Sequence, residues 1–380
     1  MNLIFFLGIV SLFADITYEG ARSIIGQYLF VLGSSSLFVG FIAGFGEFIG
    51  YFLRILFGYL ADKTKNYWLF MIIGYSLNVL SVPFLAFTNN YLIAGILILL
   101  ERLGKAIRTP SRDTIISFIG SKYGYGISFG IHEFLDQIGA LSGPLLIFLI
   151  LSLSKNNYKL SFLILIIPAI FCLIFLLWTK IKFSNINEVE IRRKRYESFK
   201  SSKKFWIYTI AIGFVSFGFV DFALISYHYK RINLFEPSII VILYSIAMIT
   251  DAITSIILGK LFDKFGIKVI IISVILTTFS GPLLFLFNEK VLSFLAIILW
   301  GIGIGSQESI MRAYISNIIK KEERATAFGI FNSIYGFSWF IGSLIIGYLY
   351  SISLIYMVIL SFSFQIFGLS FFSAILSPPC

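Results

Sequence analysis

Ionisable residues recur at helical spacing inside stretches of the chain that are otherwise apolar. Asp15, Glu19 and Arg22 are separated by four and three residues, which places them on one face of a helix. His132 and Asp136 are one helical turn apart. Charges inside apolar helices are costly to bury, so each is a candidate functional residue. Further ionisable residues, at helical spacing or beside such a set, are Glu47, Arg54, Glu101, Arg102, Lys105, Arg108, Arg112 and Glu133, and the neutral Gln137 flanks the last set.

Three kinds of chemistry fit these residues. A proton carrier needs a carboxylate or histidine whose protonation responds to a neighbouring charge, and Asp136 beside His132, with Asp15 expected opposite, meets that need. The same three residues resemble a site for Mn²⁺, Fe²⁺ or Zn²⁺, since one histidine with several carboxylates suits these metals. Arg102 and its basic neighbours would instead favour an organic anion, because a guanidinium binds carboxylate or phosphate as a fork.

The residues assigned to proton coupling or substrate binding lie mainly in the first half of the chain. The acidic and basic members could also serve only to pair with one another, and we expect structural or gating pairs for Arg54, Arg108, Arg112 and Asp113. The assigned set is Asp15, Glu19, Arg22, Glu47, Glu101, Arg102, Lys105, His132, Glu133, Asp136 and Gln137.

The elements that must position these residues are transmembrane helices. Hydrophobic residues make up 58% of the 380 residues and charged residues only 13%, against about 25% charged in soluble domains. At roughly 20 apolar residues per span, the chain holds about twelve helices. We therefore predict an all-α integral membrane protein. The apolar runs are 3–30, 36–58, 67–87, 91–111, 125–151, 158–179, 205–229, 237–258, 267–287, 291–314, 323–350 and 352–376.

An internal repeat divides the chain in two. The segment GYLADK at 58–63 returns as GKLFDK at 259–264, and Arg112 returns as Arg312, each about 200 residues later. Two related halves of six helices each are a known transporter architecture. The predicted parts are an N-terminal six-helix bundle at 1–179, a cytoplasmic basic linker at 180–204 and a C-terminal six-helix bundle at 205–380.

Lys and Arg residues indicate the orientation. Most of the 30 fall in loops on the side of the N-terminus, including the cluster at 192–195. Because cytoplasmic loops carry the excess of positive charge, both termini are expected in the cytoplasm, with the protein in the plasma membrane. The net charge of +11 thus reflects topology, and no nucleic-acid partner is expected. The residues expected outside are Lys155, Lys159, Lys230, Arg231 and Lys290.

These motifs resemble those of the major facilitator superfamily over the whole chain. The loop signature G-x-x-x-D-[RK]-x-G-[RK] is split between the halves: the second copy keeps Gly266, whereas Lys65 stands at the matching position of the first. The segment GALSGP at 139–144 resembles the G-x-x-x-G-P motif frequent in proton-coupled antiporters. The segments 102–113 and 129–137 are similar to those of a broad prokaryotic permease group without an assigned substrate.

The resemblance implies two pseudo-symmetric six-helix bundles that work by alternating access. It also implies that Asp62 braces the inside-closed state against Arg112 at the base of the fourth helix. The residues that it assigns to gating are Gly58, Asp62, Arg108, Arg112, Gly259, Asp263 and Arg312.

We therefore predict a secondary active transporter, a monomer in the lipid bilayer, that couples proton movement to export of small organic compounds. The alternative is a divalent metal cation (Fe, Mn or Zn) or organic-anion carrier in the same fold. No G-x-x-x-x-G-K-[ST] loop is present for ATP, and no cofactor is expected. His132 has no paired nucleophile within helical reach and no H-E-x-x-H pair occurs, so an enzyme is not expected.

Overall fold

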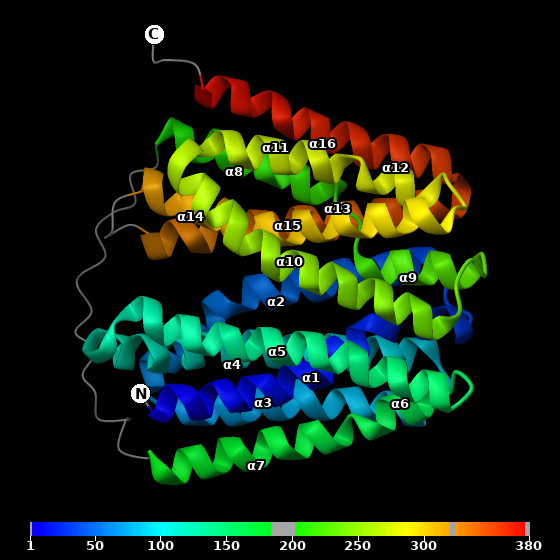
Figure 1. Ribbon diagram of the computed structural model, residues 1–380. Helices are drawn as coiled ribbons and strands as arrows, with labels where there is room; N and C mark the ends of the chain where they lie inside the picture. The colour runs from blue at the N-terminus through cyan, green and yellow to red at the C-terminus, as the bar shows by residue number, and fades with distance from the viewer. Residues whose placement is uncertain (1, 184–201, 320–323, 377–380) are drawn as a thin grey trace. The chain divides into compact units, whose positions relative to one another are not determined.

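The computed structural model describes residues 2–183, 202–319 and 324–376, and these residues form helices joined by short turns (Figure 1). The described part of the chain contains no β-strand, so the all-helical prediction is confirmed. Most of the predicted linker at 180–204, with its basic cluster at 192–195, lies outside the described residues.

The first half begins with long helices that match the predicted runs. Short breaks divide two of the runs into consecutive helices. The helices are α1 (Asn2–Val31), α2 (Ser36–Thr64), α3 (Tyr67–Phe84) with the 3₁₀ turn η1 (Leu85–Phe87), α4 (Tyr91–Tyr123), α5 (Tyr125–Leu153), α6 (Tyr158–Ile164) and α7 (Ile166–Lys182).

The second half repeats the pattern with more breaks. Three of its predicted runs are divided into two helices each. The helices are α8 (Lys203–Gly218), α9 (Phe222–Arg231), α10 (Pro237–Phe265), α11 (Ile267–Thr278), α12 (Ser280–Phe285), α13 (Lys290–Glu308), α14 (Ile310–Ile318), α15 (Arg324–Ile352) and α16 (Leu354–Leu376).

Eleven of these stretches are long and apolar enough to cross a membrane. The twelfth is α4, whose 33 residues span about 50 Å at 1.5 Å per residue. Its charged residues lower its hydropathy, but Glu101 and Arg108 are buried in the protein and do not meet lipid. Large apolar side chains such as Ile96, Ile167 and Ile256 are exposed instead, as a lipid-facing surface requires.

Contacts divide the chain into two compact units. Unit 1 comprises Met1–Gly33, Ile49–Arg192 and Pro237–Ile242, and unit 2 comprises Ser34–Phe48, Arg193–Glu236 and Leu243–Cys380. Within unit 1, α1 packs along α5 and α7, and α3 packs along α4. Within unit 2, α8 packs along α15 and α16 (Figure 1). The predicted bundle boundaries near residues 179 and 205 stay a prediction.

Two glycines set the close approach of α5 to α1. A Cβ atom on Gly139 would lie 2.5 Å from the backbone oxygen of Leu12 and 2.8 Å from the Cβ of Asp15. A Cβ atom on Gly143 would lie 2.5 Å from the backbone oxygen of Ile16. Small residues of this kind let the two backbones touch. The contact holds the α5 residues around Asp136 beside the α1 residues around Asp15.

The two copies of the loop signature share a positive φ at the position of the second glycine. Lys65, which follows α2, has φ of 57°, and Gly266, which follows α10, has φ of 59°. Both residues lie in the left-handed region, which favours glycine. The first half therefore keeps a positive φ at the position of the signature glycine although a lysine occupies it.

Lys65→Gly is expected to raise the free energy of unfolding by about 1 kcal/mol, since glycine adopts this φ without steric strain. The measurement is a detergent-denaturant unfolding titration of the purified protein. Lys63→Gly, two residues earlier in the last turn of α2, is the matched control and should lower the free energy of unfolding, because glycine has a low helix propensity. Equal effects of the same sign would contradict the argument.

Candidate functional site: a buried charge cluster in unit 1

Three helices of unit 1 bring five ionisable side chains together. We call Asp15 of α1, Arg108 and Arg112 of α4, and His132 and Asp136 of α5 the charge cluster. Arg108 Nη2 lies 3.8 Å from Asp15 Oδ1, and Arg112 Nη1 lies 3.7 Å from Asp136 Oδ2. The same Asp136 oxygen lies 3.3 Å from His132 Nδ1. Carboxylates from two helices thus face guanidinium groups from a third.

Arg108 is the most deeply buried member, with 1% of the residue exposed. Its guanidinium carbon lies 4.4 Å from the centre of the Tyr75 ring and 5.8 Å from that of Tyr18, which is cation–π geometry. Its Nε and Nη1 atoms are buried without a hydrogen-bond partner, as are His132 Nε2 and Asp136 Oδ1. Buried polar atoms of this kind need water, a proton or a polar ligand.

Arg112 connects the cluster to its surroundings. Its Nε donates to Asp113 Oδ1 at 2.9 Å, and its Nη1 donates to Ser11 Oγ at 3.3 Å. Asp62 accepts a hydrogen bond from the Tyr67 hydroxyl at 3.1 Å. The predicted brace of Asp62 by Arg112 stays a prediction.

A second group of polar side chains lies nearer the N-terminal end of α4. Asn78 of α3 donates through Nδ2 to Glu101 Oε1 at 2.7 Å, and Arg102 Nε lies 3.3 Å from Glu101 Oε2. Lys105 Nζ donates to the Tyr18 hydroxyl at 3.1 Å. Asn78 is fully buried, and the sequence reasoning missed it. The available signal was one amide residue within the apolar run of α3.

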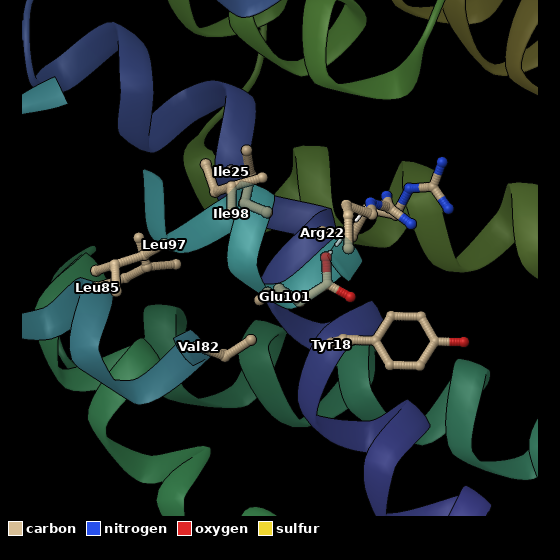
Figure 2. Close-up of a pocket in the computed structure, with 10 residues that line it drawn as sticks. Tyr18, Arg22, Ile25, Val82, Leu85, Leu97, Ile98 and Glu101 are labelled. Carbon is tan, nitrogen blue, oxygen red and sulfur yellow. Dashed lines mark ion pairs between the residues drawn. The ribbon is translucent and has the colours of Figure 1, made fainter. Parts of the chain in front are cut away.

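A narrow pocket opens beside this group. Figure 2 shows Tyr18, Arg22 and Glu101 on one side of it and Leu85 and Leu97 on the other. About 10 Å³ of it can be reached by the centre of a water molecule, which is room for about one water. In this structure the pocket is therefore too small for an organic substrate.

The other predicted residues are placed less centrally. Glu19 lies 3.8 Å from Arg22, measured from Oε1 to Nη1. Glu133 is exposed and accepts a hydrogen bond from Gln137 Nε2 at 3.2 Å. Glu133 is not a member of the charge cluster, because its side chain is exposed while the members of the cluster are buried or half-buried. The predicted site residues of unit 2 also lie outside the charge cluster; they are Glu47, Gly259, Asp263 and Arg312.

The predicted metal set of His132, Asp136 and Asp15 is not assembled. Among the residues that the structure describes, no three His, Cys, Asp or Glu side chains gather as ligands for a metal ion. The physical reason lies in the neighbours: Arg112 and Arg108 already oppose the two carboxylates, and a dication there would meet their positive charge.

Helices that cross a membrane and enclose an ionic cluster define a multi-pass membrane protein of the transporter class. The Major Facilitator Superfamily model matches residues 4–343, and a second match covers 226–379. An uncharacterized protein of Mycobacterium tuberculosis is 32% identical over 98% of this chain and 92% of its own length. An uncharacterized MFS-type transporter of Methanocaldococcus jannaschii is 30% identical over 92% and 89%. The chain belongs to the Major Facilitator Superfamily.

Solved structures show the same fold at low sequence identity. A variant of the nucleoside transporter NupG matches with a TM-score of 0.81 and 16% identity, covering 99% of this chain and all of that chain. A bacterial homolog of the human lysosomal transporter Spinster, in an inward-facing and unoccupied conformation, matches with a TM-score of 0.72 and 13% identity, covering 100% and 98%. The predicted family and all-helical membrane fold are confirmed; among the described residues, eleven helical stretches are long and apolar enough to cross a membrane, and α4 is the long helix that would complete twelve.

Proposed function

We propose that this transporter couples the movement of protons to the export of small organic compounds, and that the charge cluster is its proton site. One observation carries the proposal: carboxylates of α1 and α5 face two arginines of α4 inside the buried core of unit 1. Ionisable side chains inside membrane helices are characteristic of proton relays and substrate pathways.

Asp136 is the proton acceptor in this proposal. Its Oδ2 faces both Arg112 and His132, whereas its Oδ1 is buried without a hydrogen-bond partner. A proton that binds the carboxylate removes its negative charge and therefore its attraction for Arg112. Arg112 keeps its hydrogen bonds to Asp113 and Ser11. Protonation of Asp136 therefore changes the contact between α4 and α5 but leaves the contact between α4 and α1 in place.

Asp15 and Arg108 extend the coupling to α1. A buried charge that loses its partner is strongly unfavourable, so the charge states of the two ion pairs and the packing of the three helices depend on one another. The glycine contact of α5 with α1 transmits any shift between them. As the two halves of the fold alternate, the protonation state of the charge cluster then determines which side of the membrane the transporter is open to. The direction, export, rests on the similarity of segment 139–144 to the antiporter motif.

An organic-anion carrier is the second candidate, and Arg108 favours it. Two nitrogen atoms of this buried guanidinium, Nε and Nη1, have no hydrogen-bond partner, which is the arrangement that a carboxylate or phosphate would complete. The two candidates differ in what must move with the substrate: a proton in one, and an anion alone in the other.

The test uses the full-length protein in proteoliposomes that contain a pH-sensitive dye. Addition of a transported compound is expected to cause proton flux in the opposite direction, and an imposed pH gradient is expected to accumulate the compound. Protein-free liposomes and a protonophore are the controls. Uptake of an organic anion with no proton movement would support the second candidate and contradict the first.

A further inference from the structure

Unit 2 contains a fixed break between two helices. α8 ends at Gly218 and α9 begins at Phe222. Two carbonyl oxygens of the break accept side-chain hydrogen bonds: Trp300 Nε1 donates to the Val220 oxygen at 2.8 Å, and Gln365 Nε2 donates to the Gly218 oxygen at 3.0 Å. Non-helical backbone within a membrane span persists only where such partners exist. The break is therefore stabilised by specific hydrogen bonds from other helices.

Aromatic rings gather at this break. Phe219 lies 5.6 Å from Trp300 and 5.2 Å from Trp339 between ring centres, and Trp339 lies 5.5 Å from Tyr335 one turn earlier on α15. Each of the four is at least nine-tenths buried. We call Phe219, Trp300, Tyr335 and Trp339 the aromatic cluster.

Two hydrogen-bond donors at the cluster have no partner. Gln307 of α13 accepts a hydrogen bond from the Tyr335 hydroxyl through Oε1, but its Nε2 is buried without an acceptor. Trp339 Nε1 is also buried without an acceptor. Only 5% of Gln307 and 4% of Trp339 are exposed, so water outside the protein does not supply the missing acceptors.

A single unpartnered indole would not suggest a ligand. Trp68 Nε1 also has no partner, but Trp68 lies in the apolar core of unit 1 beside residues such as Ile4 and Val79. Gln307 and Trp339 differ from Trp68 because both contact Tyr335, so the two unpartnered donors lie beside the same aromatic cluster. Two donors beside packed aromatic rings match a flat ligand that carries acceptors at its edge.

We propose that Gln307 and Trp339 bind the transported compound through an uncharged planar ring with carbonyl or ring-nitrogen acceptors. The proposal rests on the transport function and names its substrate class. The polar groups of the site are an amide, an indole and a phenol, all neutral, and their N–H groups would repel a cation. In alternating access the substrate site lies near the bilayer midplane and is opened to one side at a time, so groups that line it are buried in a closed state.

The experiment measures binding of named probes to the purified full-length protein by titration calorimetry. The probes are uridine, nicotinamide and caffeine as uncharged rings with acceptors, benzoate as an anion and benzyltrimethylammonium as a cation. An uncharged ring is expected to bind most tightly. Tightest binding of benzoate or the cation, or no binding by any uncharged probe, would overturn the proposal.

Variants test the two donors separately. Trp339→Phe keeps a ring in place and removes only the N–H, and Gln307→Met removes the amide; each is expected to weaken binding of the uncharged probe about 3- to 10-fold. Trp206→Phe, which changes an exposed tryptophan of α8, is the matched control and should leave the affinity unchanged. If Gln307→Met misfolds, Trp339→Phe decides alone. Equal affinities of Trp339→Phe and Trp206→Phe would overturn the proposal.

The outcome separates this proposal from proton coupling. If the uncharged probe binds through these donors but moves no protons in proteoliposomes, proton coupling fails and the binding site stands. If protons move with the substrate but Trp339→Phe leaves its affinity unchanged, the binding site fails and proton coupling stands.

Discussion

Asp136→Asn is expected to abolish proton-driven counterflow in proteoliposomes, reducing it to the level of protein-free liposomes. The amide has the shape of the carboxyl group and retains an oxygen that can accept from Arg112, but it cannot take up a proton. It therefore holds α5 permanently in the state that a protonated Asp136 would give. Substrate exchange without a pH gradient should persist, because that process needs no change in protonation.

The matched control is Glu289→Gln. Glu289 is exposed and precedes α13, so the same loss of one carboxylate should leave counterflow unchanged. Asp136→Glu should retain part of the activity, since it keeps a titratable group near Arg112. Unchanged pH-driven transport in Asp136→Asn would remove Asp136 from the mechanism. Loss of exchange as well as counterflow would indicate a structural role instead.

Hydropathy and spacing predicted most of the fold. The twelve apolar runs correspond to the observed helical stretches, because length and apolar composition are what a bilayer requires. The break between α8 and α9 was not predicted within the run 205–229. Its causes are distant in sequence: Trp300 and Gln365 hold carbonyl oxygens that the helix would otherwise bond. One local signal was present, since Asp221 accepts from the Ala223 N–H as a helix N-cap.

Helical spacing predicted which charged residues share a face, but it could not say which helices meet. The pairing of Asp15 with Arg108 and of Asp136 with Arg112 depends on how α1, α4 and α5 pack. Proximity in sequence was misleading for Glu133, which is next to His132 and yet exposed.

The two amide residues show a different limit of the sequence reasoning. Asn78 and Gln307 lie in polar sites of units 1 and 2, but neither was predicted. A charge inside an apolar run stands out because its burial is costly, whereas an amide is common on many helix faces. Only the structure shows that both are buried and which groups they contact.

The ion pair of Asp15 and Arg108 is expected to give the largest effect on stability. Arg108→Met leaves Asp15 buried without its guanidinium partner, and Asp15→Asn leaves Arg108 buried without a carboxylate. Breaking a buried pair on one side costs about 3–5 kcal/mol in the free energy of unfolding. The measurement is a reversible denaturant titration of the purified protein in detergent. Lys159→Met, an exposed lysine of α6, is the control and should change stability by less than about 0.5 kcal/mol.

The double variant Asp15→Asn with Arg108→Met makes the test specific. Because it removes both charges together, it should recover part of the stability lost in each single variant, giving a coupling energy of about 0.5–3 kcal/mol. Effects that simply add would mean that the two side chains do not interact, despite the 3.8 Å between Nη2 and Oδ1. The ion pair has two roles, one in stability and one in proton coupling. A stable double variant that no longer moves protons would separate them, since packing would be restored while the charge that responds to Asp136 would be gone.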